Sequence, residues 1–456
     1  AAPPFGDSGE PQGARLSMDR ARTAALEALL QVDVNEGYSN LVMDKTIRKY
    51  ELKGRDAAFA STLFYGVLER RITLDFAITR FSKLPLASLA PKVLEILRLG
   101  AYQILFLDRV PDSAAVSESV ELAKQQGAGK ASGFVNGVLR SLIRGRETLS
   151  WPDDSVRYSC PAWLLELWTA SYGKEITSAL MECLSEPVPI FVRVNTARTN
   201  RDELIRRLAE EGVTAHCVPQ SAAALVLEKP GSIASLETFR EGLFHVQDLS
   251  SQLAACALGA EPGERVIDVC SAPGGKAFTL AEEMENQGEL LAFDKYKGKV
   301  RLISSGADRL GLTIIQASLR DAEAPKQPLA PADRVLCDAP CSGLGILRRK
   351  PEIRYKEKST LDSLPDLQYR ILCETARLVK PGGTLLYSTC TLNPAENGGV
   401  ADRFLKEHPN FSPLPVRFPA EIPHAVPEPE NQFTLFPSVH GTDGFFVSLF
   451  TRREVV

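Results

Sequence analysis

The stretch Arg265-Val-Ile-Asp-Val-Cys-Ser-Ala-Pro-Gly-Gly-Lys276 predicts a strand, a glycine loop and a helix in direct succession. Its apolar start is typical of a buried strand, and Pro-Gly-Gly interrupts that strand before a helical pattern begins at about Ala277. A second apolar run, Leu290–Asp294, follows the helix. A strand, a crossover helix and a second strand in this order favour a parallel α/β sheet.

The same alternation continues to the end of the chain. We expect helices over about 298–310 and 361–378, and strands over 313–316, 334–338, from 384 onward and over 445–450. The fold class predicted for residues 251–456 is therefore α/β and Rossmann-like, with a mostly parallel sheet.

The first part of the chain has a different pattern. Residues 1–17 are rich in Gly, Pro, Ala and Ser, so we expect disorder there. Residues 18–150 predict an all-helical domain, with one long helical segment over Arg55–Phe81 and a central helix over Val93–Leu107. Pro91 suits the first turn of that central helix, and Ser113 is a candidate cap for the next one.

Residues 151–250 predict linker helices and a small α+β unit. Strands are expected at Ile190–Val194 and Leu225–Leu227, with an amphipathic helix over Thr199–Glu211 between them. The expected chain is thus multidomain: an all-helical part, a small α+β part and a Rossmann-like α/β part.

Bulk composition excludes several classes of protein. The chain has 456 residues, a net charge of −4, nine cysteines and five histidines. No apolar stretch approaches the roughly 18 residues of a membrane span, and no signal peptide is apparent, so we expect a cytoplasmic protein without a membrane partner. The odd, scattered cysteines indicate free thiols, and without paired CxxC motifs no metal site is expected. Nothing in the sequence requires more than a monomer.

The glycine loop after the first strand has the properties of a nucleoside cofactor site. Asp294 ends the next strand, where an acid can accept the two hydroxyls of a ribose. The loop lacks the GxGxxG and GxxxxGK[ST] patterns, which disfavours a dinucleotide or a nucleoside triphosphate. A cofactor with a ribose but no phosphate, such as S-adenosylmethionine, fits better.

Two cysteines follow predicted strands in short motifs, Asp338-Ala-Pro-Cys341 and Ser388-Thr-Cys390. The ends of parallel strands are where ligands bind, so two thiols there suggest covalent catalysis with a nucleophile and a helper. Either thiol is a candidate nucleophile on chemical grounds. A mid-strand cysteine such as Cys337 is expected to be a small buried apolar residue.

A basic stretch follows the first of these motifs. Arg348, Arg349, Lys350 and Arg354 surround Tyr355, so the cations could contact RNA phosphates and the ring could stack on a base. The net negative charge excludes a global positive field but leaves room for a local basic groove.

These motifs resemble the NOL/NOP/Sun family of RNA 5-methylcytosine methyltransferases. The resemblance rests on Asp268–Lys276, Asp338–Gly343 and Ser388–Cys390, with Val246–Asp248 and Gly441–Phe446 as further segments, and it covers roughly residues 155–452. Residues 18–150 look like a NusB-type RNA-binding domain. A methyltransferase domain over 251–456 is therefore implied, with S-adenosylmethionine as the cofactor.

The resemblance also implies residue roles. It makes Cys390 the nucleophile and Cys341 the cysteine that releases the product, with Asp338 and Lys276 lining the cytosine pocket. The residues implied around the cofactor are Cys270, Ser271, Ala272, Pro273, Gly274, Gly275, Lys276, Asp294, Lys299, Ser318 and Asp338. One departure is that relatives usually carry an aspartate near the adenine where this chain has Ser318, with Asp321 three residues later. Either the loop shifts and Asp321 contacts the adenine, or recognition of the adenine is weaker here.

We therefore expect an enzyme that forms 5-methylcytosine in 16S rRNA or a small-subunit precursor, through a cysteine–cytosine adduct. The same chemistry on tRNA is the nearest alternative. A non-enzymatic RNA-binding factor is a second alternative. A small-molecule methyltransferase is a third alternative, but it leaves the helical domain unexplained.

Overall fold

The computed structural model of the chain describes residues 12–35 and 39–454. It divides into two units, one built from the chain up to Glu166 together with Leu347–Lys356, and the other from Leu167–Ile346 and Glu357–Val456.

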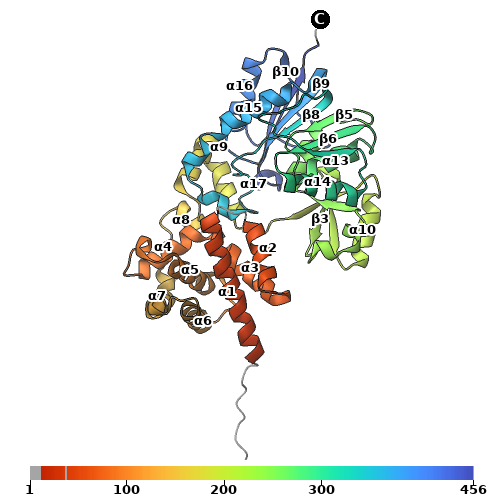
Figure 1. The fold of residues 1–456 in the computed structure, drawn as a ribbon. Helices are drawn as coiled ribbons and strands as arrows, with labels where there is room; N and C mark the ends of the chain where they lie inside the picture. The colour runs from red at the N-terminus through yellow and green to blue at the C-terminus, as the bar shows by residue number, and fades with distance from the viewer. Residues whose placement is uncertain (1–11, 36–38, 455–456) are drawn as a thin grey trace, which may run out of the picture. The chain divides into compact units, whose positions relative to one another are not determined.

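The first unit is helical (Figure 1). Its helices are α1 (Gln12–Asn35), α2 (Ser39–Lys49), α3 (Gly54–Glu69), α4 (Arg71–Phe81), α5 (Pro91–Phe106), α6 (Asp112–Gln125), α7 (Ser132–Gly145) and α8 (Asp154–Tyr158). Helix α5 is central, because nearly all of its residues from Val93 to Ile104 are buried. This confirms the predicted central helix, with Pro91 in its first turn.

Three expectations for the helical unit are wrong. The long segment Arg55–Phe81 is two helices, because Arg70 leaves helical geometry at φ −120° and ψ 21°. Ser113 is not a cap, since α6 begins one residue earlier and makes no side-chain cap hydrogen bond. Helix α1 begins at Gln12, so disorder is wrong for residues 12–17, while residues 1–11 lie outside the described part.

The second unit contains a small antiparallel sheet in the order β2-β3-β1-β4. Its elements are β1 (Ile190–Val194), α10 (Arg201–Glu210), β2 (Thr214–Val218), β3 (Ser221–Glu228), α11 (Glu237–Arg240) and β4 (Phe244–Val246), preceded by α9 (Ala162–Cys183), which spans the boundary between the units. β1 and α10 confirm the predictions, and Asn200 caps α10 by accepting from the Glu203 amide. β2 and β4 were not predicted, since exposed polar residues and short length weaken their pattern.

The larger sheet of the same unit has the order β10-β12-β9-β8-β5-β6-β7, with β11 paired to β12. Its strands are β5 (Arg265–Asp268), β6 (Glu289–Asp294), β7 (Ile315–Leu319), β8 (Ala332–Asp338), β9 (Val379–Thr389), β10 (Phe411–Pro413), β11 (Gln432–Leu435) and β12 (Phe445–Arg452). The pairs from β9 through β7 are parallel and those of β12 are antiparallel, so the predicted mostly parallel sheet is confirmed.

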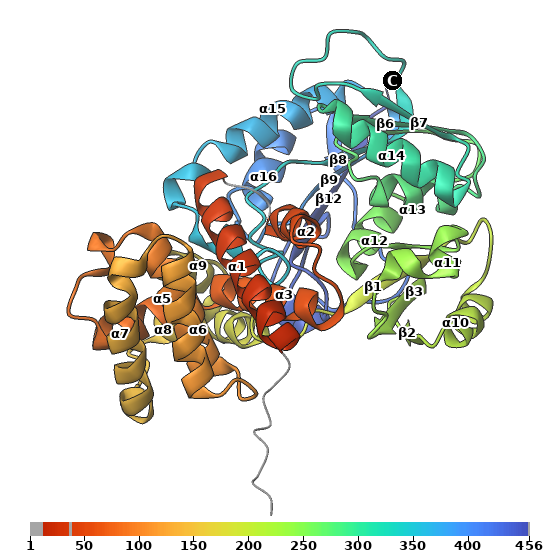
Figure 2. The same cartoon turned by 60° about the horizontal axis from the view of Figure 1, so that its bottom comes forward.

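Helices cover both faces of this sheet, as Figure 2 shows. They are α12 (Leu249–Ala257), α13 (Gly275–Glu283) and α14 (Lys297–Leu310) on one face, and α15 (Leu364–Ala376) and α16 (Gly398–Glu407) on the other. Alternate strand residues serve the two faces: Val266 packs with the first group of helices and Ile267 with the second. Cys337 is fully buried on the second face, as expected.

The strand order reverses between β5 and β8. From β5 the chain builds outward through β6 and β7, then returns to place β8 on the other side of β5. In open α/β sheets, ligands bind at the carboxyl ends of the strands at such a reversal. The loops after β5 and β8 are those of Gly274 and Cys341, so the topology selects this edge for the site.

Candidate active site

The loop after β5 requires glycine at position 274. Gly274 has φ 114°, and a Cβ atom there would lie 2.4 Å from the Phe278 ring. The Ser271 amide donates to the Phe293 carbonyl at 2.8 Å, which ties the loop to the end of β6. The loop therefore lies beside Asp294, as the strand–loop–helix pattern predicts.

Two buried aspartates end the strands that flank this loop. Asp294 is 7% exposed, its Oδ1 accepts from the Tyr296 amide at 3.0 Å, and Lys299 Nζ lies 3.8 Å from Oδ2. Asp268, at the end of β5, is fully buried, and this burial raises its pKa to about 7, despite the nearby Ser271 hydroxyl and Lys276 ammonium.

Strand β7 ends later than the apolar pattern predicts. The expected strand over 313–316 lies at Ile315–Leu319, because its last residues are exposed at the edge of the sheet and interrupt the apolar run. Ser318 is thus inside the strand, paired with Phe293. Asp321 follows the strand end, next to Arg320, whose amide donates to the Asp294 carbonyl at 3.0 Å.

The two motif cysteines meet at the carboxyl ends of β8 and β9. The Sγ atoms of Cys341 and Cys390 are 3.2 Å apart, so one thiol can donate to the other. Hydrogen bonding to Cys390, then burial and the charge of Cys390, raise the pKa of the Cys341 thiol well above its usual range. Cys341 therefore keeps its proton at neutral pH.

Lys276 and Asp338 form an ion pair beside the cysteines, with Nζ 2.8 Å from Oδ2. Burial alone would lower the pKa of Lys276, but the charge and hydrogen bond of Asp338 outweigh it and raise that pKa. The Ser388 hydroxyl donates to Asp338 Oδ1 at 2.8 Å, and the Phe445 ring centroid lies 4.8 Å from Lys276 Nζ. A cation and a carboxylate are thus held next to two thiols.

Hydrogen bonds join the loops that carry the two thiols, here named the Pro-Cys loop (residues 339–346) and the Thr-Cys loop (residues 390–397). Ser342 and Thr391 share a 2.6 Å hydroxyl contact, and the Gly345 amide donates to the Cys390 carbonyl at 3.0 Å. Gly345 must be glycine, because a Cβ atom would lie 2.0 Å from the Gly444 carbonyl oxygen.

Most of the sequence-predicted site residues therefore lie in one unit and at one edge of its sheet. The structure adds Ser388, Ser342, Thr391 and Phe445, for which no individual role was predicted. Ser388, Ser342 and Phe445 do lie inside motif segments, which is the signal that could have found them. The segments Val246–Asp248 and Gly441–Phe446 also meet, because the Asp443 amide donates to Asp248 Oδ1 at 3.0 Å.

The basic stretch requires a correction. Leu347–Lys356 folds with the helical unit, and Arg354 is only 1% exposed. Its guanidinium donates to backbone carbonyls of Glu69, Tyr158, Ser159 and Leu347 at 3.3–3.4 Å. The predicted RNA contact by Arg354 is therefore wrong, because its donors bind backbone carbonyls inside the protein.

Tyr355 is also largely occupied. Its hydroxyl lies 2.9 Å from the Ser159 hydroxyl, and Arg71 lies 5.3 Å from its ring centroid. The side chains of Arg348, Arg349 and Lys350 are half-buried and also engaged in interactions. The stretch is thus mainly an anchor within the helical unit.

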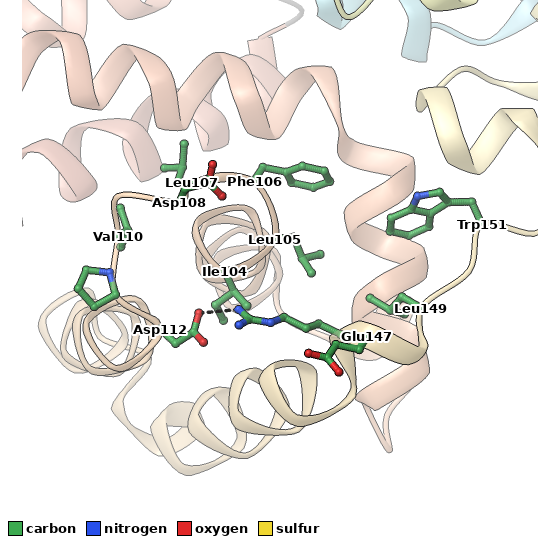
Figure 3. A pocket seen from close by; sticks show the side chains of 12 residues that line it. Ile104, Leu105, Phe106, Leu107, Asp108, Val110, Asp112, Glu147, Leu149 and Trp151 are labelled. Carbon is green, nitrogen blue, oxygen red and sulfur yellow. Dashed lines mark hydrogen bonds and ion pairs between the residues drawn. The ribbon is translucent and has the colours of Figure 1, made fainter.

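A separate pocket of about 640 Å³ lies within the helical unit (Figure 3). Most of its lining is apolar, its acidic members are Asp108, Asp112 and Glu147, and Arg146 is paired with Asp112 at 3.0 Å. It contains none of the predicted site residues, and three carboxylates beside one paired arginine do not suit RNA phosphates.

No described helix is long and apolar enough to cross a membrane. Among residues 12–35 and 39–454, no group of three or more His, Cys, Asp or Glu side chains could hold a metal ion.

Comparisons with known proteins agree along the chain. The model of the NusB family matches residues 19–144, that of the RsmF/B-like ferredoxin-like domain matches 160–234, and that of the 16S rRNA methyltransferases RsmB/F matches 255–451. The crystal structure of PH0851 is similar, with a TM-score of 0.80 and 26% identity, covering 95% of this chain and 99% of that one.

Curated relatives extend this similarity over nearly the whole chain. The probable ribosomal RNA small subunit methyltransferase B of Bacillus subtilis is 40% identical, covering 95% of this chain and 98% of the relative. The protein of the same name from Synechocystis is 37% identical, covering 94% of this chain and 99% of the relative. The chain therefore belongs to the RsmB/F family of 16S rRNA methyltransferases, with a NusB domain, a ferredoxin-like subdomain and a Rossmann-like methyltransferase domain.

Proposed function

We propose that this protein is a cytosolic enzyme that transfers a methyl group from S-adenosylmethionine to carbon 5 of one cytosine in 16S rRNA. The observation that carries the proposal is the 3.2 Å contact between Cys341 and Cys390, beside the Lys276–Asp338 pair. Carbon 5 of cytosine is a weak nucleophile, and a thiol that adds to carbon 6 activates it. Two thiols and a proton donor are the groups that such a reaction needs.

The residues around the loop after β5 fit the cofactor. Asp294 is a buried carboxylate at a strand end, suited to the two ribose hydroxyls, and Gly274 brings backbone close to the same position. We assign Cys270 to Lys276, Asp294 and Lys299 to holding the cofactor. When bound, S-adenosylmethionine supplies an electrophilic methyl group.

Cys390 is the nucleophile in this proposal. Its thiolate Sγ forms a bond to carbon 6, and the π electrons of the 5,6 double bond shift toward ring nitrogen 3. A proton from the Lys276–Asp338 pair neutralises that nitrogen and leaves carbon 5 nucleophilic. The Ser388 hydroxyl and the Phe445 ring keep the pair in place.

Cys341 removes the proton that remains on carbon 5 after methylation. In the free enzyme the hydrogen bond and charge of Cys390 raise the pKa of Cys341. Once Cys390 is bonded to carbon 6, that charge is gone, so Cys341 can lose its proton to solvent. Its thiolate then takes the carbon-5 proton, the 5,6 double bond re-forms, the bond from carbon 6 to Cys390 breaks, and nitrogen 3 returns its proton to the pair.

The choice of RNA is assigned to the NusB domain. The relatives from Bacillus subtilis and Synechocystis are named as probable small subunit rRNA methyltransferases, which supports 16S rRNA or a small-subunit precursor as the substrate. The target base must leave its stack to reach a thiol, which is easiest in an unpaired or distorted RNA segment.

The experiment that tests the function is methyl transfer from labelled S-adenosylmethionine to unmodified 16S rRNA and to tRNA, with the product mapped as 5-methylcytosine. Label at one cytosine of 16S rRNA is the expected result. Label only in tRNA would support the proposed reaction but identify tRNA, and not 16S rRNA, as the substrate. No label in either RNA, with no binding of the cofactor, would favour an RNA-binding factor instead.

Two cysteine variants test the roles within the reaction. Cys390→Ala should abolish transfer, and Cys341→Ala should accumulate a covalent protein–RNA complex that runs slowly on a denaturing gel. Cys217→Ala is the matched control, since that thiol is exposed on β2. Turnover by Cys390→Ala would remove the nucleophile role of Cys390. A complex trapped in Cys390→Ala and not in Cys341→Ala would exchange the roles of the two cysteines.

A further inference from the structure

Glu396 lies in the Thr-Cys loop as a buried carboxylate with a full set of donors. Its side chain is 0% exposed. Oε2 accepts from the Ser342 amide at 2.9 Å and from Gln368 Nε2 at 2.8 Å, and Oε1 accepts from Asn393 Nδ2 at 2.9 Å. These three hydrogen bonds supply the buried carboxylate with polar partners.

These bonds reach both sides of Cys341. Ser342 follows Cys341, and its amide donates directly to Glu396. Pro340 precedes Cys341, and its carbonyl accepts from the same Gln368 nitrogen at 3.0 Å. The peptide groups that flank Cys341 are thus fixed by one carboxylate and by the amide group that it orients.

Glu396 is also fixed to the strand that carries Cys390. Its backbone carbonyl accepts from the Tyr387 hydroxyl at 2.6 Å, and Tyr387 is a fully buried residue of β9. Glu396 therefore connects the Pro-Cys loop to the end of β9.

We propose that Glu396 is a positioning residue that holds Cys341 against Cys390 and so governs release of the methylated base, an inference that rests on the function proposed above. The carboxylate does not touch the base. It orients the Pro-Cys loop, and its negative charge, 0% exposed, is among the causes that raise the pKa of Cys341. Small displacements of a reacting group are costly, which is why a buried anchor is expected here.

The first test needs no RNA. Diamide oxidises two thiols to a disulfide: the thiols lose two electrons and two protons, and the N=N bond of diamide takes them up to become a hydrazine. The rate at which linked Cys341–Cys390 peptides form, followed by mass spectrometry, reports how often the sulfurs are in contact. We expect Glu396→Ala to slow this rate about tenfold and Glu396→Gln to slow it less, since an amide keeps one acceptor.

Glu428→Gln is the matched control. Glu428 is also a largely buried carboxylate of the same unit, but its partners are the amide and hydroxyl of Thr434, on β11, and His424, whose Nδ1 lies 3.7 Å from Oε2. Its linking rate should equal that of the unmodified protein. Gln368→Ala should displace the Pro-Cys loop in the same way, and it replaces Glu396→Ala in the test if that variant does not fold.

The second test measures release. Glu396→Ala and Gln368→Ala should accumulate the covalent protein–RNA complex about tenfold above the unmodified enzyme, and Glu396→Gln should accumulate less of it. Binding of S-adenosylmethionine should be unchanged in all three variants. Glu428→Gln should not accumulate it.

The two tests separate the possible failures. A linking rate within twofold of the unmodified protein in Glu396→Gln and Gln368→Ala would overturn the positioning role, whatever the enzyme acts on. If linking slows but Cys341→Ala traps no complex, the release role of Cys341 is wrong and Glu396 is left as a positioning residue for the thiol pair alone. If Cys341→Ala traps a complex and the Glu396 variants do not, the control of release by Glu396 is overturned.

Discussion

Lys276 Nζ lies 2.8 Å from Asp338 Oδ2, which joins the first turn of α13 to the carboxyl end of β8. The same strand carries a second pair of this kind, Lys380 with Asp333 at 2.8 Å, near its other end. The two pairs match in chemistry and distance. Only the Lys276–Asp338 pair lies beside the cysteines, so the Lys380–Asp333 pair is a control for the role of the first pair in catalysis.

Asp338→Asn should lower kcat by about 10²–10⁴-fold, because the pair loses the proton donor proposed for ring nitrogen 3. Asp333→Asn should leave kcat within a few-fold of the unmodified enzyme, since its exposed pair contributes little. Single-turnover methyl transfer, with cofactor affinity measured in parallel, makes the comparison. An equal loss in both variants would assign Asp338 to folding.

Cys390→Ala should move the reactivity of Cys341 to lower pH. The hydrogen bond to Cys390 is the largest cause of the raised pKa of Cys341. The thiolate is the form that iodoacetamide attacks, so removing that cause shifts the profile of alkylation rate against pH downward. Mass spectrometry of the peptide that contains Cys341 measures it, and the exposed Cys217 should give the same profile in both proteins. Superimposable Cys341 profiles would contradict the coupling.

Arg354→Ala should destabilise the helical unit by about 1.5–3 kcal/mol, because the charged donors that four backbone carbonyls share are lost. Urea unfolding measures the change. Lys356→Ala is the control in the same segment, with an exposed side chain and an expected change within about 0.5 kcal/mol. If Arg354→Ala keeps full stability but binds RNA more weakly, Arg354 contacts RNA after all.

Asp321→Ala should weaken binding of S-adenosylmethionine more than Ser318→Ala does. Ser318 is inside β7, whereas Asp321 lies in the loop that returns to the Asp294 carbonyl, and its Oδ2 is 2.9 Å from Lys295. We expect a loss of about tenfold for Asp321→Ala, roughly the value of one hydrogen bond. Isothermal titration of the cofactor measures both variants. A larger loss in Ser318→Ala would reverse the assignment.

The parts of the fold that could be predicted are those with a strong periodic pattern. β1 and α5 lie where their apolar runs predict them, because both are buried in a core and periodicity records that burial. The break at Arg70 was not visible, since an arginine between two helical patterns gives no Gly or Pro signal. β2 was not predicted, and β7 was predicted too early in the chain, because exposed strand residues leave no apolar alternation in the sequence.

The strand–loop–helix order, the family motifs and the two candidate thiols can be read from the sequence, because these features are local in the chain and use residue types with few alternative roles. Which groups meet depends on the fold. The return of β8 to the side of β5 brings Asp338 to Lys276, and the pairing of β8 with β9 brings Cys341 to Cys390. The burial of Arg354 and the donors around Glu396 were equally invisible in sequence, because they depend on backbone groups from distant segments that fold together.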